Sequence, residues 1–387
     1  MIRTCPTDFF PDNTDHQTPK YVTDIAQIEQ LSPQERQELQ TVVEKFPFRA
    51  NSYYLSLIDW NDPNDPIRRL IVPSVDELQA GGDLDPSGEV HYTVLPGLEH
   101  KYNSTALLLA SSVCGAICRY CFRKRVFIQD HREILSDIPA AVEYIRQHTE
   151  ITNVLLTGGD PLLLSTNKIR HIIQQIIDID HVRIIRIGSK MPAFNPFRIL
   201  NDPDLLNLID ECDAARKQMY FLTHFSHPRE LTDAAKAAIK MLRRTGAVLT
   251  NQTPIIAGVN DDPYVLAELF RKLSFNGVPP YYVFQCRPAL GNKAYAVPIE
   301  EAYQIFDRAN SMVSGLAKRS RFVMSHVSGK IEVTGIDEHN LYLRYHRAAD
   351  DGDSGKSIVA RRNPDAYWFS DYEAVEDALT ADLQHQS

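Results

Sequence analysis

From residue 105 onward the chain alternates between short apolar runs and segments with helical periodicity, and this pattern limits the possible folds more than any other feature. The apolar runs have the length of strands and lie at residues 106–110, 153–157, 183–187, 219–223, 247–251 and 281–285. Segments such as TNKIRHIIQQII and LTDAAKAAIKMLRRTG separate them and have the periodicity of amphipathic helices. Apolar strands separated by helices predict an α/β fold, either a partial (β/α)6 barrel or an open doubly wound sheet. Both place the ligand site at the carboxyl ends of the strands.

Three cysteines follow the first apolar run in the segment CGAICRYCFRKR, at Cys114, Cys118 and Cys121. No fourth cysteine is nearby, and three thiolates on a cubic [4Fe-4S] cluster leave one iron open for a small molecule. A zinc knuckle would need a fourth Cys or His at similar spacing, and three unconnected core cysteines are the other alternative. The spacing resembles the signature of the radical SAM enzymes, in which the open iron holds S-adenosylmethionine (SAM).

A glycine-rich turn follows the second apolar run, in VLLTGGDPLLL at residues 154–164. Gly158 and Gly159 allow a close approach of the backbone to a ligand, and Asp160 can cap the next helix or accept a hydrogen bond from an ammonium. Alone, this pattern fits an ordinary turn between a strand and a helix equally well. Beside the cysteine motif, it resembles the turn that holds the methionine amino group in radical SAM proteins.

A lysine near the end of the pattern is a candidate for covalent catalysis. Lys330 follows Ser328-Gly329 and precedes the strand-like IEV in FVMSHVSGKIEVTG. A lysine on a loop of small residues can reach a pocket and form a Schiff base, which is how pyridoxal phosphate (PLP) is usually attached. By itself, however, this lysine fits a solvated surface charge better.

Composition excludes several classes of protein. A chain of 387 residues with 43% hydrophobic side chains can bury a large core, and its net charge of −9 argues against nucleic acid as a partner. Six cysteines, three of them in one motif, do not form a disulfide framework, so we expect a reducing compartment. Neither an apolar signal segment nor a membrane-spanning stretch is present in the sequence, which predicts a cytoplasmic protein without a membrane partner.

The sequence predicts four regions: a flexible N-terminal arm at 1–22, a helical and loop extension at 23–100, a core at 101–315, and a C-terminal segment with the candidate lysine and a tail at 316–387. In the extension, Ser32-Pro33-Gln34-Glu35 has the residues of a helix start. We expect loops at residues 76–100 and in the segment RAADDGDSGKSIVARRNPD near the end of the chain.

Taken together, these motifs resemble the lysine 2,3-aminomutase family of radical SAM, PLP-dependent enzymes over roughly residues 45–345. Further matching pieces are PNDPIRR, LPGLEHKY, IRIGSK, FLTHFSHPRELT, LTNQTPIIAGVND and PYYVFQCRPALG. The resemblance implies a radical SAM barrel, and an isomerase that moves the α-amino group of an amino acid to the β-carbon. It implies three cofactors, a [4Fe-4S] cluster, SAM and PLP, and an external reductant of the flavodoxin or ferredoxin type. A homo-oligomer is expected as well.

The resemblance also implies roles for individual residues. Lys330 is similar to the lysine that forms the Schiff base with PLP, and Arg123 to the arginine that pairs with the substrate α-carboxylate. Lys101, Tyr102 and Tyr281 are expected near PLP or the adenosyl group. The residues expected around SAM are Gly158, Gly159, Asp160, Ser189, His224 and Gln252. In the implied reaction, a 5′-deoxyadenosyl radical removes a hydrogen from the β-carbon, and the nitrogen migrates while bonded to PLP.

Departures from the family pattern concern the substrate and the coenzyme phosphate. Arg287 follows FQC, where the lysine enzymes have an aspartate for the distal ammonium, and no acid stands at Met324-Ser325 in place of the second such aspartate. A guanidinium repels an ammonium and pairs with a carboxylate, so we predict an acidic substrate such as glutamate, unless Arg287 pairs with a neighbouring acid. Thr105 stands where a phosphate-binding arginine is expected. The C-terminal zinc-binding cysteines of some members are absent from the sequence, so we expect metal-free oligomer contacts.

Three alternative functions remain open at this level. The first is lysine 2,3-aminomutase, and the second is a relative that acts on another amine or on a protein-bound lysine. The third is a non-catalytic iron-sulfur protein, in which Lys330 would have no chemical role.

Overall fold

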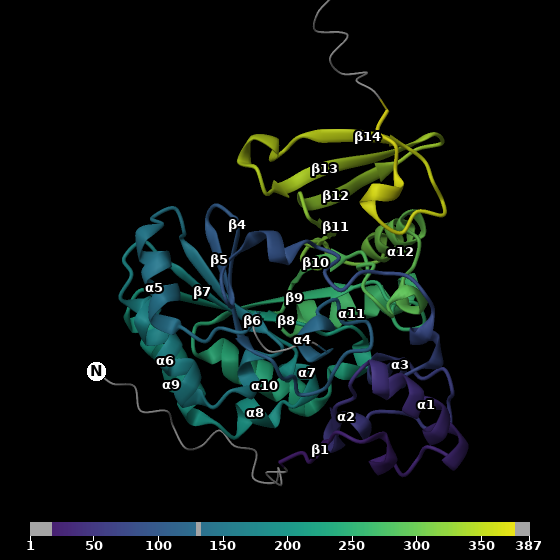
Figure 1. Ribbon diagram of the computed structural model, residues 1–387, viewed down its shortest axis with the longest axis horizontal. Helices are drawn as coiled ribbons and strands as arrows, with labels where there is room; N and C mark the ends of the chain where they lie inside the picture. Colours follow the sequence, from purple (N-terminus) through teal and green to yellow (C-terminus); the bar gives the residue numbers. More distant parts are fainter. Residues whose placement is uncertain (1–17, 129–132, 376–387) are drawn as a thin grey trace, which may run out of the picture.

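The computed structural model describes residues 18–128 and 133–375, and its central feature is one sheet of 12 strands (Figure 1). The strand order is β14-β13-β12-β11-β10-β9-β8-β7-β6-β5-β4-β3, so every strand lies beside its neighbour in the sequence. Strands β5 to β11 pair in parallel, and antiparallel strands extend the sheet at both edges. The prediction of an α/β fold with a largely parallel sheet is therefore confirmed.

The six predicted apolar runs are the first six parallel strands: β5 (Thr105–Ser111), β6 (Asn153–Gly158), β7 (Ile184–Ser189), β8 (Gln218–Thr223), β9 (Val248–Pro254) and β10 (Pro280–Phe284). A seventh parallel strand, β11 (Arg321–His326), was not predicted. The helices that separate these strands are α4 (Arg125–Ile128), α5 (Ile138–Gln147), α6 (Thr166–Ile177), α7 (Met191–Phe194), α8 (Phe197–Leu200), α9 (Pro203–Ala214), α10 (Asp233–Arg244), α11 (Pro263–Phe275) and α12 (Ile299–Ser311).

The long helices cover the sheet because their apolar residues recur at helical spacing. In α6, Ser165 caps the first turn by accepting a hydrogen bond from the backbone N–H of Lys168. Its buried side chains fall on one face, three and four residues apart, at Thr166, Ile169, Ile172, Ile173 and Ile176. This face packs onto the strands and closes the main hydrophobic core.

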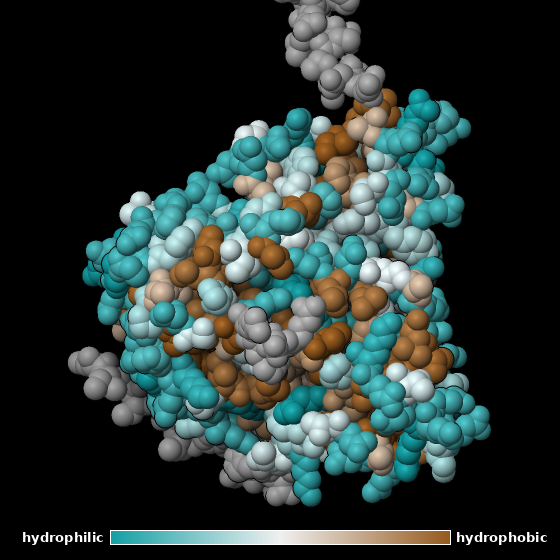
Figure 2. All heavy atoms as spheres, in the orientation of Figure 1, coloured by the Kyte–Doolittle hydropathy of each residue, from teal (hydrophilic) through white to brown (hydrophobic). Residues whose placement is uncertain are grey.

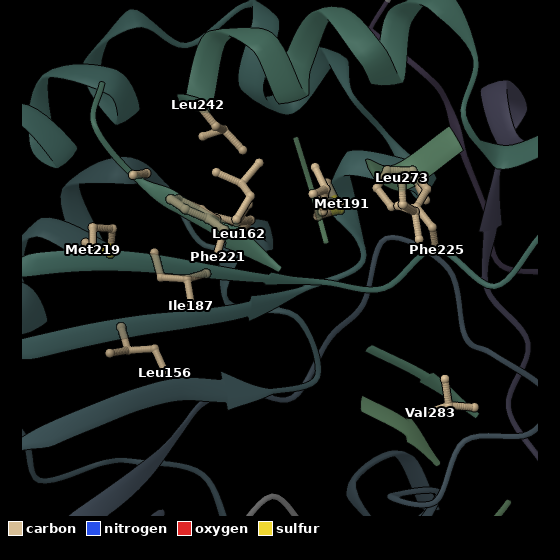
Figure 3. Packing of buried hydrophobic residues seen from close by; sticks show 14 of the residues in the cluster. Leu156, Leu162, Ile187, Met191, Met219, Phe221, Phe225, Leu242, Leu273 and Val283 are labelled. Carbon is tan, nitrogen blue, oxygen red and sulfur yellow. The ribbon is translucent and has the colours of Figure 1, made fainter. Parts of the chain in front are cut away.

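Alternate residues of the central strands face opposite sides of the sheet. Leu156, Ile187 and Phe221 pair in register across β6, β7 and β8, and all three are buried in the main core. Figure 3 shows these side chains on neighbouring strands. The alternating residues Leu155 and Arg186 instead line a cavity. A strand can therefore carry a charged residue toward a ligand site while its next side chain packs under a helix.

The N-terminal part packs as a second hydrophobic core, which includes Ala116 and Tyr120 beside the cysteines. Helix α1 (Pro33–Lys45) begins with Ser32 as its N-cap, as predicted. It is followed by α2 (Ser52–Leu55) and α3 (Pro66–Ile71), while β1 (Tyr21–Val22) pairs with β2 (Ala50–Asn51). Residues 1–17 of the predicted arm lie outside the described residues.

Each of the two predicted loops contains strand residues as well as loop. Residues 76–100 contain β3 (Thr93–Leu95) and the start of β4 (Leu98–Tyr102), which extends the sheet beside β5. The late segment contributes the end of β13 (Asn340–Ala348) and all of β14 (Ser357–Arg361), next to β12 (Gly329–Ile336). The loop prediction was wrong there because charged residues flank a short edge strand, and edge strands tolerate such charges.

Short 3-10 turns complete the described chain: Ile25–Gln27, Val75–Leu78, Glu89–Tyr92, Pro161–Leu163, Pro228–Glu230, Lys293–Tyr295, Asp351–Asp353 and Phe369–Asp371. In Figure 2, hydrophilic side chains cover the outer rim of the visible face, and hydrophobic ones gather toward its centre. No described helix combines the length and the apolar character needed to cross a bilayer.

Candidate active site

A cavity of about 330 Å³ lies within the curve of the sheet, and strands from β4 to β13 contribute to its wall. Because strands near both edges of the sheet line one cavity, the sheet must bend around it as a partial barrel does. All of the sequence-predicted site residues line this cavity: Lys101, Tyr102, Cys114, Cys118, Cys121, Arg123, Gly158, Gly159, Asp160, Ser189, His224, Gln252, Tyr281, Arg287 and Lys330. Their individual roles remain predictions.

The cysteine loop follows β5 and is held by the N-terminal extension. Arg119, between the second and third cysteines, is 1% exposed, and its guanidinium forms two hydrogen bonds with Glu77, of 2.9 and 2.8 Å. It also donates to the carbonyls of Phe46 and Pro47, while its own N–H donates to Leu70. This buried arginine therefore ties the loop to the region of α1 and α3.

The three thiols fit a cluster better than a single ion. Cys114, Cys118 and Cys121 are free cysteines, and each lines the cavity. The described residues contain no group of three His, Cys, Asp or Glu side chains arranged around one metal ion. The three thiolates of a cubic cluster bind different irons, so they need not converge on one point. The donor set is thus suited to a [4Fe-4S] cluster with one open iron.

The glycine turn after β6 is docked against the start of the cysteine loop. The N–H of Gly159 donates to Ser111, and the N–H of Asp160 donates to Val113, at 2.8 Å. A Cβ on Gly159 would lie 2.5 Å from the Val113 carbonyl oxygen, and Gly158 has a φ of +125°. These glycines are therefore required by the contact between two loops, in addition to any contact with a ligand.

Asp160 organises the neighbouring turn. Its carboxylate accepts hydrogen bonds from the Ser189 hydroxyl, the Lys190 N–H and the Leu162 N–H, at 2.8 to 3.0 Å. Burial raises its pKa to about 6, although these hydrogen bonds act in the opposite direction. Capping, one of the two roles predicted for Asp160, is therefore observed, and it connects β6 with β7.

His224 lies beside the cysteine loop in a polar cluster. Its Nε2 is 3.0 Å from the Tyr120 hydroxyl, and burial together with the charge of Lys190 lowers its pKa well below the usual value. Lys190 donates to the His224 carbonyl and forms a 2.9 Å ion pair with buried Glu230. The neutral imidazole is thus positioned next to the cysteine end of the cavity.

Lys330 reaches into the cavity near the beginning of β12. Its ammonium donates to the Ser325 hydroxyl at 3.2 Å and lies 5.1 Å from the ring centre of Tyr282 and 5.2 Å from that of Phe284. Burial lowers its pKa well below the usual value, and Arg287 and Lys101 contribute to the shift. A lysine in such surroundings is readily neutral and nucleophilic, as attachment of PLP requires.

Two buried glutamates shape the charge in the middle of the cavity. Glu89 accepts hydrogen bonds from Arg123 at 2.8 and 2.9 Å and from Arg125 at 2.6 Å. Burial would raise the pKa of Glu89, but these arginines outweigh burial and lower it. Burial and the charge of Glu89 raise the pKa of Glu99 to about 8. Both acids come from the segment that was predicted to be a loop.

Arg287 is only partly neutralised by these acids. Its Nη1 lies 3.7 Å from Glu89 and makes no hydrogen bond with any described residue. The guanidinium instead stacks on Phe122, with its central carbon 3.6 Å from the ring centre. The sequence left open that Arg287 pairs with a neighbouring acid. The structure shows such a pair with Glu89, but it is a long ion pair without a hydrogen bond.

Sequence reasoning missed several residues that line the cavity. These are Glu89, Glu99, Arg186, Tyr282 and Arg347. Tyr282 stands next to the predicted Tyr281 on β10, and because neighbouring strand residues face opposite sides of a sheet, the choice of Tyr281 argued against Tyr282. No local pattern distinguishes the other four from ordinary charged residues.

A parallel sheet surrounds one cavity, which is lined both by three cysteines that follow the first parallel strand and by a partly buried lysine. This arrangement defines the class of a radical SAM enzyme with a second cofactor. No protein-family model matches the chain. A protein of Aquifex aeolicus strain VF5, provisionally named an L-lysine 2,3-aminomutase, is 54% identical over 354 residues, which cover 91% of this chain and 95% of the relative. This chain belongs to the lysine 2,3-aminomutase family.

Two further aminomutases agree with this assignment. The L-lysine 2,3-aminomutase of Clostridium subterminale is 37% identical over 288 residues, which cover 74% of this chain and 68% of the relative. The glutamate 2,3-aminomutase of Clostridioides difficile strain 630 is 32% identical over 300 residues, with coverage of 76% and 69%. A solved radical SAM methyltransferase from Sphaerobacter thermophilus matches 58% of this chain and 68% of its own, with a TM-score of 0.38 and 17% identity.

The protein is thus a radical SAM amino acid 2,3-aminomutase, an isomerase of a family that uses a [4Fe-4S] cluster, SAM and PLP. The alternative of a non-catalytic iron-sulfur protein is not supported, since the relatives are aminomutases. The external reductant and the homo-oligomer stay predictions.

Proposed function

We propose that Cys114, Cys118 and Cys121 hold the cluster and SAM at one end of the cavity, and that Lys330 holds PLP at the other. The observation that carries this proposal is that Lys330 lines the same cavity as the three cysteines, although it is far from them in the sequence. When bound, the three cofactors supply hydrogen abstraction and a carrier for the migrating nitrogen. The protein supplies binding, orientation and exclusion of water.

Individual side chains divide these tasks. Lys330, with its lowered pKa, presents a neutral amine to the coenzyme aldehyde, and Ser325 orients that amine by a hydrogen bond. Arg123 is fixed by Glu89, so its guanidinium keeps one position while its remaining donor, Nη1, lies 3.3 Å from Thr157. A fixed arginine at this place can orient a substrate α-carboxylate. Aromatic side chains around Lys330 shield the reacting carbon atoms from water.

For the substrate, we infer that free L-lysine is the first candidate. The name of the relative with 54% identity favours it over the glutamate that Arg287 suggested. In the cavity, the buried Oε1 of Glu99 has no hydrogen-bond partner among the described residues. An ammonium group of the substrate would supply that partner and would favour the ionised carboxylate. Glu89 also reduces the repulsion between Arg287 and a cationic substrate.

Glutamate remains the second candidate because of Arg287 itself. Its buried Nη1 lacks a hydrogen-bond partner in the described part of the chain, and a buried guanidinium donor without one is costly. A side-chain carboxylate would pair with it more strongly than the 3.7 Å contact with Glu89 does. A glutamate 2,3-aminomutase is among the relatives, at lower identity than the lysine enzymes reported above.

Product analysis separates these candidates. The protein is reconstituted anaerobically and incubated with SAM, PLP, a reductant, and lysine, glutamate, arginine or aspartate in parallel. We expect the unmodified protein to form β-lysine. We expect the Glu99→Gln variant to have a higher KM for lysine and an unchanged KM for glutamate. β-Glutamate alone would overturn the lysine proposal and support the role of Arg287. Formation of 5′-deoxyadenosine without any β-amino acid would refute both candidates, and would favour another amine or a protein-bound lysine.

A further inference from the structure

Arg347 lies directly opposite Lys330 on the neighbouring strand. Strands β12 and β13 are antiparallel, and their register pairs Lys330 with Arg347. Residues that are directly opposite on neighbouring strands share a face, with Cβ atoms about 4.5–5.5 Å apart. Both side chains line the cavity. The C-terminal strands therefore place a second cation beside the lysine that is proposed to hold PLP.

The position of the Arg347 guanidinium is fixed by residues at the start of β5. Its Nη2 donates to the Ser104 hydroxyl at 2.7 Å and to the Thr105 hydroxyl at 3.0 Å. Its central carbon lies 4.3 Å from the ring centre of Tyr102, which orients the plane of the group. The Nε and Nη1 donors form no hydrogen bond with a described residue, and no described carboxylate forms an ion pair with Arg347. Two nitrogen atoms, with three N–H groups between them, thus remain for a ligand.

The charge around Arg347 favours an anion. After burial, the charges of Arg287, Lys101, Arg186 and Arg347 further lower the pKa of Lys330. Arg186, on β7, also lines the cavity, and its buried Nε lacks a hydrogen-bond partner among the described residues. The cationic side chains gathered in this cavity repel one another, even where Lys330 itself is neutral. A bound anion would remove this repulsion and satisfy the free donors.

The chemistry of PLP matches this arrangement. Its aldehyde and its phosphate-bearing group are attached to adjacent ring atoms, so the attachment lysine and the phosphate site must be neighbours. A guanidinium binds phosphate oxygens through two parallel hydrogen bonds, and hydroxyl groups add further donors. The position at which the family resemblance places a phosphate-binding arginine is Thr105 here, and Arg347 is hydrogen-bonded to that residue.

We propose that Arg347, together with Thr105 and Arg186, binds the phosphate of PLP, so that β13 supplies the arginine that is missing at position 105. This inference rests on the proposed attachment of PLP to Lys330. Arg347 does not take part in bond making. It is a binding residue for the coenzyme, and it recognises the phosphate group rather than the pyridine ring.

The test compares PLP with pyridoxal, which has the aldehyde but no phosphate. Apparent Kd values for both are measured by the absorbance of the lysine adduct in the full-length chain, and borohydride reduction with peptide mass spectrometry locates the adduct. We expect Arg347→Met to weaken PLP binding about 10- to 100-fold, because a hydrogen-bonded charge pair is lost, and to change pyridoxal binding less than about threefold. Arg344→Met is the matched control, since Arg344 is an exposed residue of the same strand.

A second variant distinguishes the loss of phosphate binding from a folding defect caused by Arg347→Met. The double variant Thr105→Arg, Arg347→Met places a guanidinium at the same site, now carried by β5 instead of β13. We therefore expect the double variant to recover most of the preference for PLP over pyridoxal. Equal losses of PLP and pyridoxal affinity in Arg347→Met, without recovery in the double variant, would overturn the inference. An adduct on Lys330 with an unchanged preference would overturn it while leaving the proposed function intact. Absence of any adduct on Lys330 in the unmodified chain would overturn both.

Discussion

Replacing Glu77 by glutamine should loosen the cysteine loop and destabilise the protein. Glu77 is fully buried and accepts hydrogen bonds from Arg119 at 2.8 and 2.9 Å, from Tyr295 at 3.2 Å and from Lys124 at 3.5 Å. Glu77→Gln keeps the shape of the side chain but removes the negative charge that compensates two buried cations. Breaking a buried ion pair by removing one partner costs about 3–5 kcal/mol.

The structure favours the lower end of that range. Arg119 keeps its hydrogen bonds to the carbonyls of Phe46 and Pro47, and the new amide retains one acceptor oxygen. We therefore expect the free energy of unfolding of the cofactor-free protein to fall by about 3 kcal/mol. Because Arg119 lies between Cys118 and Tyr120, we also expect less iron per chain after reconstitution.

Chemical denaturation measures the first effect, and iron analysis together with electron paramagnetic resonance measures the second. Glu44→Gln is the control, because Glu44 is an exposed residue of α1 and the substitution makes the same change of charge at the surface. If Glu77→Gln matched this control in both stability and iron content, the claim that Arg119 and Glu77 hold the cysteine loop would be refuted.

Three further predictions concern the cavity and the glycine turn. The pKa of Glu99 is raised from 4.5 to about 8, so the folded protein binds more protons than the unfolded chain between these values, and its stability falls as the pH rises through this window. Glu99→Gln should therefore be stabilising above about pH 8 and neutral near pH 4 in denaturation curves; the opposite trend would contradict the shift. Arg287→Met should lower the KM for lysine and raise it for glutamate, and equal changes for both would show that Arg287 does not sense substrate charge. Gly159→Ala should lower the iron content after reconstitution because its Cβ would meet Val113 at 2.5 Å, whereas Gly315→Ala, with nothing within 4 Å, should not; equal iron contents would exclude the proposed contact.

Much of the framework was predictable from local patterns. The six central strands and the helix that starts after Ser32 follow from periodicity and capping, which act over a few residues. The candidate residues of the cysteine and glycine motifs also converge as expected, since parallel strands end at the same edge of a sheet. Strand β14 was missed, because an exposed edge strand with flanking charges lacks the apolar signal of a central strand.

The sequence by itself determined the chemistry that the chain can perform, through the spacing of three cysteines and the presence of Lys330 in a family-specific context. Only the tertiary structure decided which charges meet in the cavity. Glu89 neutralises Arg123, and Arg347 reaches Thr105 from 242 positions away in the sequence. Such contacts depend on how distant strands pack into one sheet, and no short pattern encodes them. The substrate preference and the phosphate site therefore depend on tertiary packing, whereas the reaction class can be predicted from local motifs.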